Sequence, residues 1–218
     1  MTDAILHYYY DPLCGWCYAA APLVAAAAEV GIDIALHGGG LWDKPQPYPQ
    51  GMVSRIREME TRIAYQTGQP YGEAYTNGLL VDPATILHSR PPTSAILAAG
   101  AIDKDRSLPM LRALQMAHFV EGRRIVEPQV LTAVARGIGL DELAFDRAVE
   151  HVPADDHIAE TRQRMQLGRA SGFPTFVLER DGRTITIDHS RYYGRPDAFA
   201  RAVDEASSAK SSFHTTEQ

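Results

Sequence analysis

Residues 11–18 read Asp-Pro-Leu-Cys-Gly-Trp-Cys-Tyr and contain both cysteines of the 218-residue chain, Cys14 and Cys17. Two cysteines are too few for a framework of structural disulfides, and the Cys-x-x-Cys spacing favours catalysis or metal binding instead. A disulfide across so short a loop would also restrict the unfolded chain very little. We therefore expect this stretch to carry the chemistry of the protein.

The stretch lies between a predicted strand and a predicted helix. Residues 5–10 combine bulky apolar side chains with three tyrosines, and the following Asp-Pro indicates a turn. Residues 16–30 are rich in Ala, Leu and Val, and Gly31 is typical of the end of a helix. Residues 32–37 alternate apolar and polar side chains, as in a strand. These segments predict a strand–helix–strand unit with Cys14 at the N-terminal edge of its helix.

The centre of the chain is predicted to be an all-helical insert, because apolar residues recur there at helix spacing. The expected helices span residues 52–67, 92–101, 106–121, 127–137, 140–150 and 155–168. Strand patterns return after Gly168, with a hairpin predicted at residues 173–178 and 184–188 around Asp-Gly. A last helix is expected from Pro196 to about residue 206.

The position of Cys14 indicates how the pair would work. A thiolate is the form that attacks a disulfide, so a catalytic thiol needs a pKa brought down from about 8.5 toward neutrality. The N–H groups and the dipole at a helix N-terminus stabilise an anion. Cys17, three residues further on, would face the same side within bridging distance. We expect Cys14 to be the exposed nucleophile, Cys17 the resolving thiol, and Gly15 and Trp16 the residues that tune the redox balance.

Composition disfavours several other classes of function. A structural zinc usually has four Cys or His ligands, whereas the chain offers one Cys-x-x-Cys and eight scattered histidines, so no metal is expected. Thiol exchange needs no organic cofactor. The net charge is −6 without a basic stripe, which argues against nucleic acid and anionic membrane partners. Because no membrane-spanning run or secretory signal is visible, we expect a cytoplasmic location.

The strand, the Cys-Gly-Trp-Cys motif, the helical centre and Ser-Gly-Phe-Pro-Thr-Phe-Val at residues 171–177 together resemble the DsbA family, especially its non-secreted, FrnE-like protein-disulfide isomerase branch. The resemblance spans about residues 4–206. It implies an α/β architecture, a thioredoxin fold with a large all-helical insertion. We expect a discontinuous thioredoxin-like domain formed by residues 1–48 and 168–208. A helical insertion domain is expected at residues 49–167, and a disordered tail at residues 209–218.

The resemblance adds two candidate substrate-binding residues, Phe173 and Pro174. In this family the matching proline follows a cis peptide bond and lies against the active-site disulfide, which implies a cis Phe173–Pro174 bond. Phe173 would then offer its N–H and C=O groups to an extended substrate beside Cys14. Phe173 could instead be a core aromatic residue at the start of a strand. Secreted members often carry Pro-His between their cysteines, so their oxidising character is not carried over to this chain, and their buried acid near the resolving cysteine has no clear match.

A few further residues are ambiguous in the sequence. His88 could act near Cys14, although a surface turn before a helix is the simpler interpretation. The glycines at 38–40 lack the spacing of a phosphate-binding loop, which favours a flexible connector. Trp42, Tyr48 and Tyr71 are compatible with a groove, but isolated aromatics usually serve packing.

Three classes of function stay open. The first is thiol–disulfide exchange of the protein-disulfide isomerase or reductase type, with protein or low-molecular-weight thiol and disulfide substrates and an unknown redox recycling partner. The second is a glutathione-dependent transferase or isomerase of the kappa-class or 2-hydroxychromene-2-carboxylate isomerase type, whose members place Ser where this chain has Cys14. The third is a non-enzymatic protein-binding module, which gains nothing from an activated thiol pair. The dithiol favours the first class.

Overall fold

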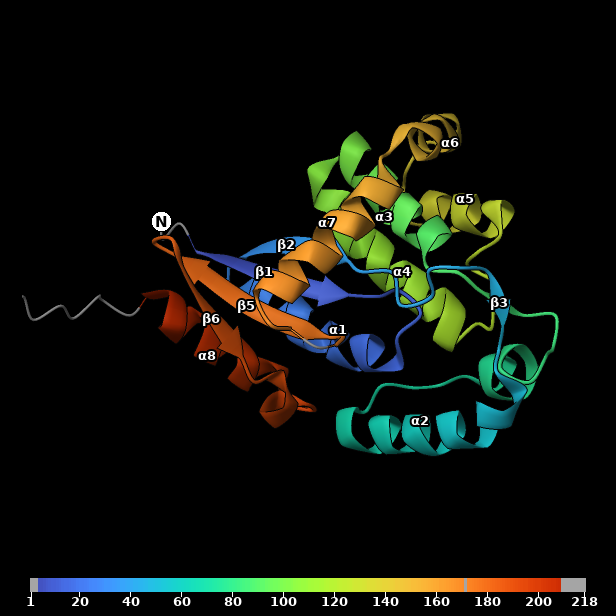
Figure 1. Ribbon diagram of the computed structural model, residues 1–218, viewed down its shortest axis with the longest axis horizontal. Coiled ribbons are helices and arrows are strands. Elements are labelled where there is room, and N and C mark those ends of the chain that lie inside the picture. Colours follow the sequence, from blue (N-terminus) through green and yellow to red (C-terminus); the bar gives the residue numbers. More distant parts are fainter. Residues whose placement is uncertain (1–3, 171, 209–218) are drawn as a thin grey trace, which may run out of the picture.

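The computed structural model describes residues 4–170 and 172–208, so the tail predicted to be disordered lies outside the described residues. Its centre is a four-stranded sheet in the order β2-β1-β5-β6. The strands are β1 (Ile5–Tyr10), β2 (Asp33–Gly38), β5 (Thr175–Arg180) and β6 (Arg183–Ile187). β1 runs parallel to β2 and antiparallel to β5, so segments from both ends of the chain lie side by side (Figure 1).

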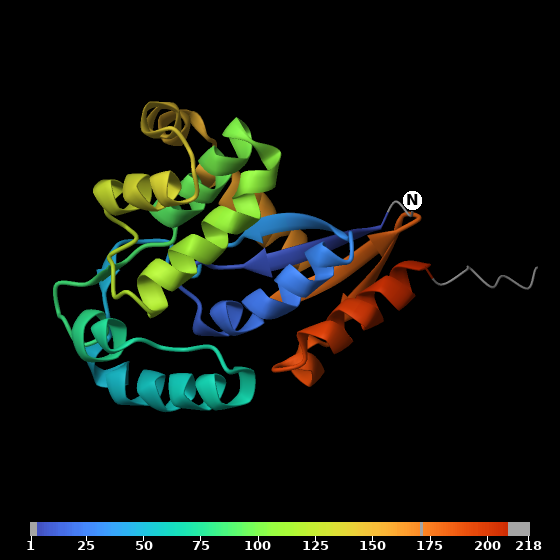
Figure 2. The ribbon, with the colours of Figure 1, turned by 180° about the vertical axis from the view of Figure 1, so that it is seen from behind.

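Helices cover both faces of this sheet. α1 (Gly15–Glu29) and α8 (Pro196–Ser208) pack against each other on one side, and α7 (Ala154–Leu167) crosses the other side against β2 (Figures 1 and 2). Strand β1 is therefore buried from both directions, apart from its first residue, Ile5. Its aromatic run fits this position because Tyr8 stacks on Phe176 of β5, with ring centroids 4.7 Å apart.

The remaining helices form the part of the molecule between β2 and α7. They are α2 (Val53–Thr67), α3 (Arg90–Ile102), α4 (Ser107–Phe119), α5 (Pro128–Gly137) and α6 (Glu142–His151). Short elements connect them: two-residue strands β3 (Gln46–Pro47) and β4 (Ile86–Leu87), which pair with each other, the 3-10 turns Gln50–Met52 and Lys104–Arg106, and a π-helical turn at Ala74–Leu79. The 3-10 turn His189–Tyr192 precedes α8.

The predicted elements are confirmed, with ends displaced by a few residues. The helix expected at 52–67 ends at Gly68, which caps it with a φ of 73°. The hairpin turns at Asp181 and Gly182, both with positive φ. The two-residue strands and the π-helical turn are absent from the prediction because such short elements have no repeating pattern. The domain boundaries stay a prediction.

Candidate active site

The N-terminus of α1 places the two cysteines differently. Cys14 is the N-cap residue, with φ −90° and ψ 117°, and Cys17 lies in the first turn of the helix. Cys14 is 8% exposed and Cys17 is completely buried. The expectation of an exposed nucleophile is therefore wrong in degree, because neighbouring chain segments cover most of Cys14. Burial raises the pKa of the Cys17 thiol well above its usual range, and a hydrogen bond with Cys14 raises it further.

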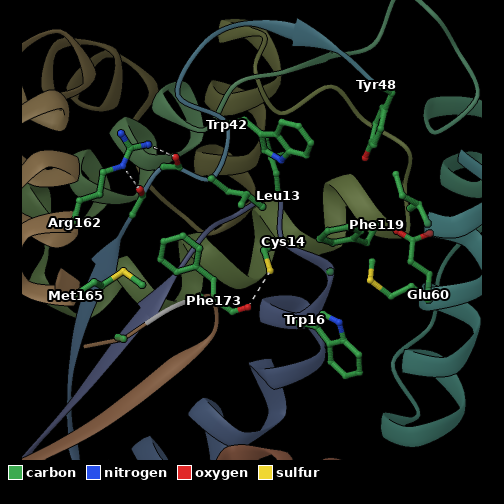
Figure 3. Close-up of a pocket in the computed structure, with 18 of the residues that line it drawn as sticks. Leu13, Cys14, Trp16, Trp42, Tyr48, Glu60, Phe119, Arg162, Met165 and Phe173 are labelled. Carbon is green, nitrogen blue, oxygen red and sulfur yellow. Dashed lines mark hydrogen bonds between the residues drawn. The ribbon is translucent and has the colours of Figure 1, made fainter. Parts of the chain in front are cut away.

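The segment before β5 lies directly over Cys14. The Phe173–Pro174 bond is cis, which confirms the expectation drawn from the resemblance. The Cys14 thiol is positioned to donate to the Phe173 carbonyl, at 3.7 Å from Sγ to oxygen (Figure 3). The main chain of residue 173 thus borders the sulfur that a substrate would have to reach.

Asp11 fixes the loop around the cysteines, and sequence reasoning missed this role. It is fully buried, and its carboxylate accepts hydrogen bonds from the N–H groups of Leu13 at 2.9 Å and Leu41 at 2.6 Å. Its own N–H points at Cys17 Sγ, at 3.5 Å. Burial raises the pKa of Asp11, while these hydrogen bonds lower it. Its place directly after a strand and within the quoted motif was the available signal.

Cys14 opens into a cleft of about 620 Å³ whose walls are mostly apolar and aromatic (Figure 3). The cleft is lined by Leu13, Cys14, Gly15, Trp16, Gly39, Gly40, Leu41, Trp42, Tyr48, Ile56, Met59, Glu60, Tyr75, Phe119, Arg162, Met165, Gln166, Ala170, Gly172 and Phe173. Of the ambiguous aromatics, Trp42 and Tyr48 belong to this wall, whereas Tyr71 packs behind it on Phe119. His88 does not line the cleft.

Two glycines of the run at residues 38–40, Gly39 and Gly40, form one side of the cleft. All three glycines are buried, so the expectation of a flexible connector is wrong. A Cβ on Gly39 would lie 2.1 Å from the Phe173 ring, which means that the ring occupies the space a side chain would need. The guanidinium of Arg162 on α7 donates to the carbonyl of Gly39 at 2.9 Å and to that of Gly40.

A hydrogen-bonded group lies at the other end of the cleft, and the sequence did not indicate it. Tyr75 donates its O–H to Glu60 Oε1 at 2.5 Å. The Tyr48 hydroxyl lies 3.3 Å from that of Tyr75 and 3.2 Å from His118 Nε2. Burial raises the pKa of Glu60 to about 7 and lowers that of His118 to about 3.

A smaller cavity of about 450 Å³ shares Trp16, Gly172 and Phe173 with the cleft. Trp16, Phe173 and Pro174 border it together with Tyr193, whose ring centroid is 5.3 Å from that of Trp16. The structure thus brings the predicted site residues together around Cys14, with Cys17 behind it. The described residues contain no cluster of His, Cys, Asp or Glu that could hold a metal ion.

A dithiol at a helix N-terminus that borders a cleft suits thiol–disulfide exchange, which depends on thiolate character and on access to the sulfur. The family model of the DsbA-like thioredoxin domain matches residues 5–199. The chain belongs to the DsbA-like thioredoxin family. The fold class predicted from the sequence is thereby confirmed.

Similar solved structures support the same family. The cytosolic disulfide reductase DsbM from Pseudomonas aeruginosa is 46% identical, covers 93% of this chain and 98% of its own, and superposes with a TM-score of 0.85. Its structure with GSH, aligned at 44% identity over 93% of this chain and 98% of that chain, gives a TM-score of 0.84. Like other members of the DsbA-like family, this chain is an enzyme, a thiol–disulfide oxidoreductase that acts on thiol and disulfide substrates.

A 2-hydroxychromene-2-carboxylate isomerase covers 93% of this chain and 97% of its own with a TM-score of 0.60, but at 15% identity the likeness shows the fold alone. The comparison with curated proteins found no match. Among the described residues, no helix is both long and apolar enough to cross a bilayer.

Proposed function

We propose that this protein works as a cytosolic disulfide reductase in which Cys14 attacks the substrate and Cys17 resolves the mixed disulfide, with glutathione as its low-molecular-weight thiol partner. The observation that carries the proposal is the pairing of a cleft-lining Cys14 with a buried Cys17 in a chain 46% identical to a cytosolic disulfide reductase. That reductase has also been solved with GSH.

The reaction proceeds by two exchanges of sulfur. The Cys14 thiolate attacks one sulfur of the substrate disulfide, forms a mixed disulfide with it and releases the other sulfur as a thiolate, which takes a proton from water. Cys17 then loses its proton and attacks the Cys14 sulfur, which releases the second substrate thiol. The substrate gains two electrons and two protons, and the enzyme is left with a Cys14–Cys17 disulfide. Two molecules of glutathione restore the dithiol and become glutathione disulfide.

The other site residues support these steps from fixed positions. We assign the Phe173 main chain and Pro174 to substrate binding, because the Phe173 carbonyl lies 3.7 Å from Cys14 Sγ, Phe173 lines both cavities and Pro174 lines the smaller one. Gly15 and Trp16 lie between the two cysteines in the sequence and form part of the cleft wall, so we assign them to tuning of the redox balance. The redox direction itself is inferred from the reductase relative.

The reduction potential of the Cys14–Cys17 pair, equilibrated against glutathione, tests the proposal. We expect a value near that of thioredoxin, about −270 mV, whereas an oxidant such as DsbA lies near about −120 mV. Cys14→Ser should abolish the reduction of disulfides. Glutathione conjugation or isomerisation that survives Cys17→Ala would instead place the protein among the glutathione-dependent transferases and isomerases.

A further inference from the structure

Glu60 is a buried carboxyl group in the wall of the Cys14 cleft, and it is 4% exposed. It lies on α2, where Ile63 is the one other buried residue. An amphipathic helix normally turns apolar side chains toward the interior, and an unpaired Glu is rarely this deeply buried. The position of this carboxyl group therefore calls for a physical reason.

Hydrogen bonding within the protein satisfies one of its two oxygens. Oε1 accepts the Tyr75 O–H, but Oε2 has no hydrogen-bond partner among the residues that the structure describes. The charged group acting on it is Arg57, whose guanidinium is bound to the Thr76 carbonyl at 2.7 Å. A buried acceptor left unpaired costs stability, so a partner from outside the chain would explain its retention.

The surroundings of Glu60 favour a cationic partner. Tyr48, Tyr75 and Phe119 line the same part of the cleft, and aromatic faces attract cations. Figure 3 shows Glu60 and Arg162 at opposite ends of the cleft with Cys14 between them. Glu60 also borders a cavity of about 360 Å³ on its other side, but Arg57 lines that cavity and repels a cation there.

We propose that Glu60 determines substrate specificity: its carboxylate attracts the ammonium or guanidinium group of a disulfide whose sulfur is attacked by Cys14. The inference rests on the proposed function, because Cys14 must exchange with the disulfide that carries the cation. It goes further in naming the charge of the substrate. A small aminothiol and a peptide with a basic residue beside its cysteine share this chemistry.

The charge state of Glu60 gives the proposal a pH dependence. Its pKa is about 7, so the carboxylate that binds a cation forms between about pH 6 and pH 8. The other titratable and charged groups that face it are Tyr48, Tyr71, Tyr75 and Arg57. Burial raises the pKa values of the tyrosines, and Arg57 keeps its charge, so these groups do not change in this range. His118, behind Tyr48, stays neutral because its pKa is about 3.

The test uses single turnovers of the reduced full-length protein with small disulfides of different charge. Cystamine is cationic, bis(2-hydroxyethyl) disulfide is neutral and dithiodiglycolate is anionic. Each oxidises the Cys14–Cys17 dithiol to a disulfide and leaves as two thiols, so no recycling partner is needed. Acid quenching and mass spectrometry give a second-order rate constant for each probe.

We expect the wild type to react faster with cystamine than with the neutral probe. Glu60→Gln keeps an acceptor for Tyr75 but removes the charge, so the ratio of the two rate constants should fall about tenfold or more. Glu58→Gln, on the exposed side of the same helix, is the matched control and should keep the ratio. Tyr75→Phe removes a hydrogen bond that lowers the pKa of Glu60, so the pH midpoint of the cystamine preference should move upward.

An unchanged ratio in Glu60→Gln, or an unmoved pH midpoint in Tyr75→Phe, would overturn the specificity role while leaving disulfide reduction intact. Failure of the wild type to react with any of the disulfides would refute the proposed function itself. The disulfide-linked dimers of acetyl-Cys-Lys-amide and acetyl-Cys-Gln-amide distinguish a peptide substrate from a small aminothiol. A Glu60-dependent preference for the lysine peptide indicates a peptide substrate, and a preference confined to cystamine indicates a small aminothiol.

Discussion

A methyl group at Gly39 is expected to push Phe173 away from Cys14. An ideal Cβ at Gly39 would lie 2.1 Å from Cζ and 2.4 Å from Cε1 of the Phe173 ring. Carbon atoms in contact rest at about 3.5–4.0 Å, so the ring has to retreat by roughly 1.5 Å. Gly39 is not among the residues with positive φ, so the backbone accepts Ala and the effect of Gly39→Ala is steric.

This displacement has consequences for both stability and rate. Overpacking of this kind costs about 1–3 kcal/mol, and each kcal/mol lowers the Tm of a chain of this size by about 2–4 °C. The Phe173 carbonyl lies 3.7 Å from Cys14 Sγ, so movement of the ring and its main chain disturbs the approach to the sulfur. A misplacement of about 1 Å near reacting atoms can reduce a rate about 100-fold. We therefore expect Gly39→Ala to oxidise about 10- to 100-fold more slowly with bis(2-hydroxyethyl) disulfide.

The assay compares the wild type with four variants by thermal unfolding and by this rate constant. Gly137→Ala is the control, since nothing lies within 4 Å of a Cβ at that position. Phe173→Ala removes the ring, so the clash disappears in the double variant Gly39→Ala/Phe173→Ala. The loss of stability in the double variant should therefore be smaller than the sum of the two single losses by about 1 kcal/mol or more. Effects that add within about 0.5 kcal/mol would refute the contact between Gly39 and Phe173 as the cause.

Three further outcomes follow from the site. Asp11→Ala leaves the N–H groups of Leu13 and Leu41 without their acceptor and should lower the free energy of unfolding by about 2–5 kcal/mol in urea titrations; wild-type stability would mean that another acceptor replaces the carboxylate. Burial raises the pKa of Glu60 from 4.5 to about 7, so the folded state retains a proton that the unfolded state has released in this interval. As the pH rises from about 4.5 to about 7, the free energy of unfolding of the wild type should therefore fall by up to about 3 kcal/mol relative to that of Glu60→Gln. Parallel curves of stability against pH for the two proteins would contradict this. Cys17→Ser should accumulate a mixed disulfide on Cys14, visible as an increase in intact mass, and an adduct on Cys14→Ser instead would reverse the assigned roles.

The parts of the fold that could be predicted are those with local patterns. The strand–helix–strand unit of residues 5–38 follows from alternation, helix propensity and a terminal glycine, all of which act within a few residues. The position of Cys14 at the helix N-cap follows from the same signals. The cis Phe173–Pro174 bond depended on the family resemblance, since sequence alone gives the cis isomer of an X-Pro bond a low frequency.

The parts that could not be predicted depend on contacts between distant segments. Arg162 and Gly39 are 123 residues apart, and a glycine pattern does not distinguish a flexible connector from a surface against which a ring packs. Tyr75 reaches Glu60 from a π-helical turn, which has no repeating pattern in the sequence. The network at the end of the cleft therefore appears only when α2 and this turn are placed together in space.

The two buried carboxyl groups of the site differ in a way that separates structural from substrate-binding roles. Both have a pKa raised by burial, so both tend to weaken the folded state when they are ionised. Hydrogen bonds offset this cost at Asp11, because each of its oxygens accepts a main-chain N–H and these bonds hold the loop around the cysteines. At Glu60 the cost of burial is offset only in part, because Tyr75 donates to one oxygen and the other has no partner among the described residues. Loss of the Asp11 carboxylate should therefore lower stability, whereas Glu60→Gln should raise stability at high pH and change which disulfide the Cys14 cleft accepts.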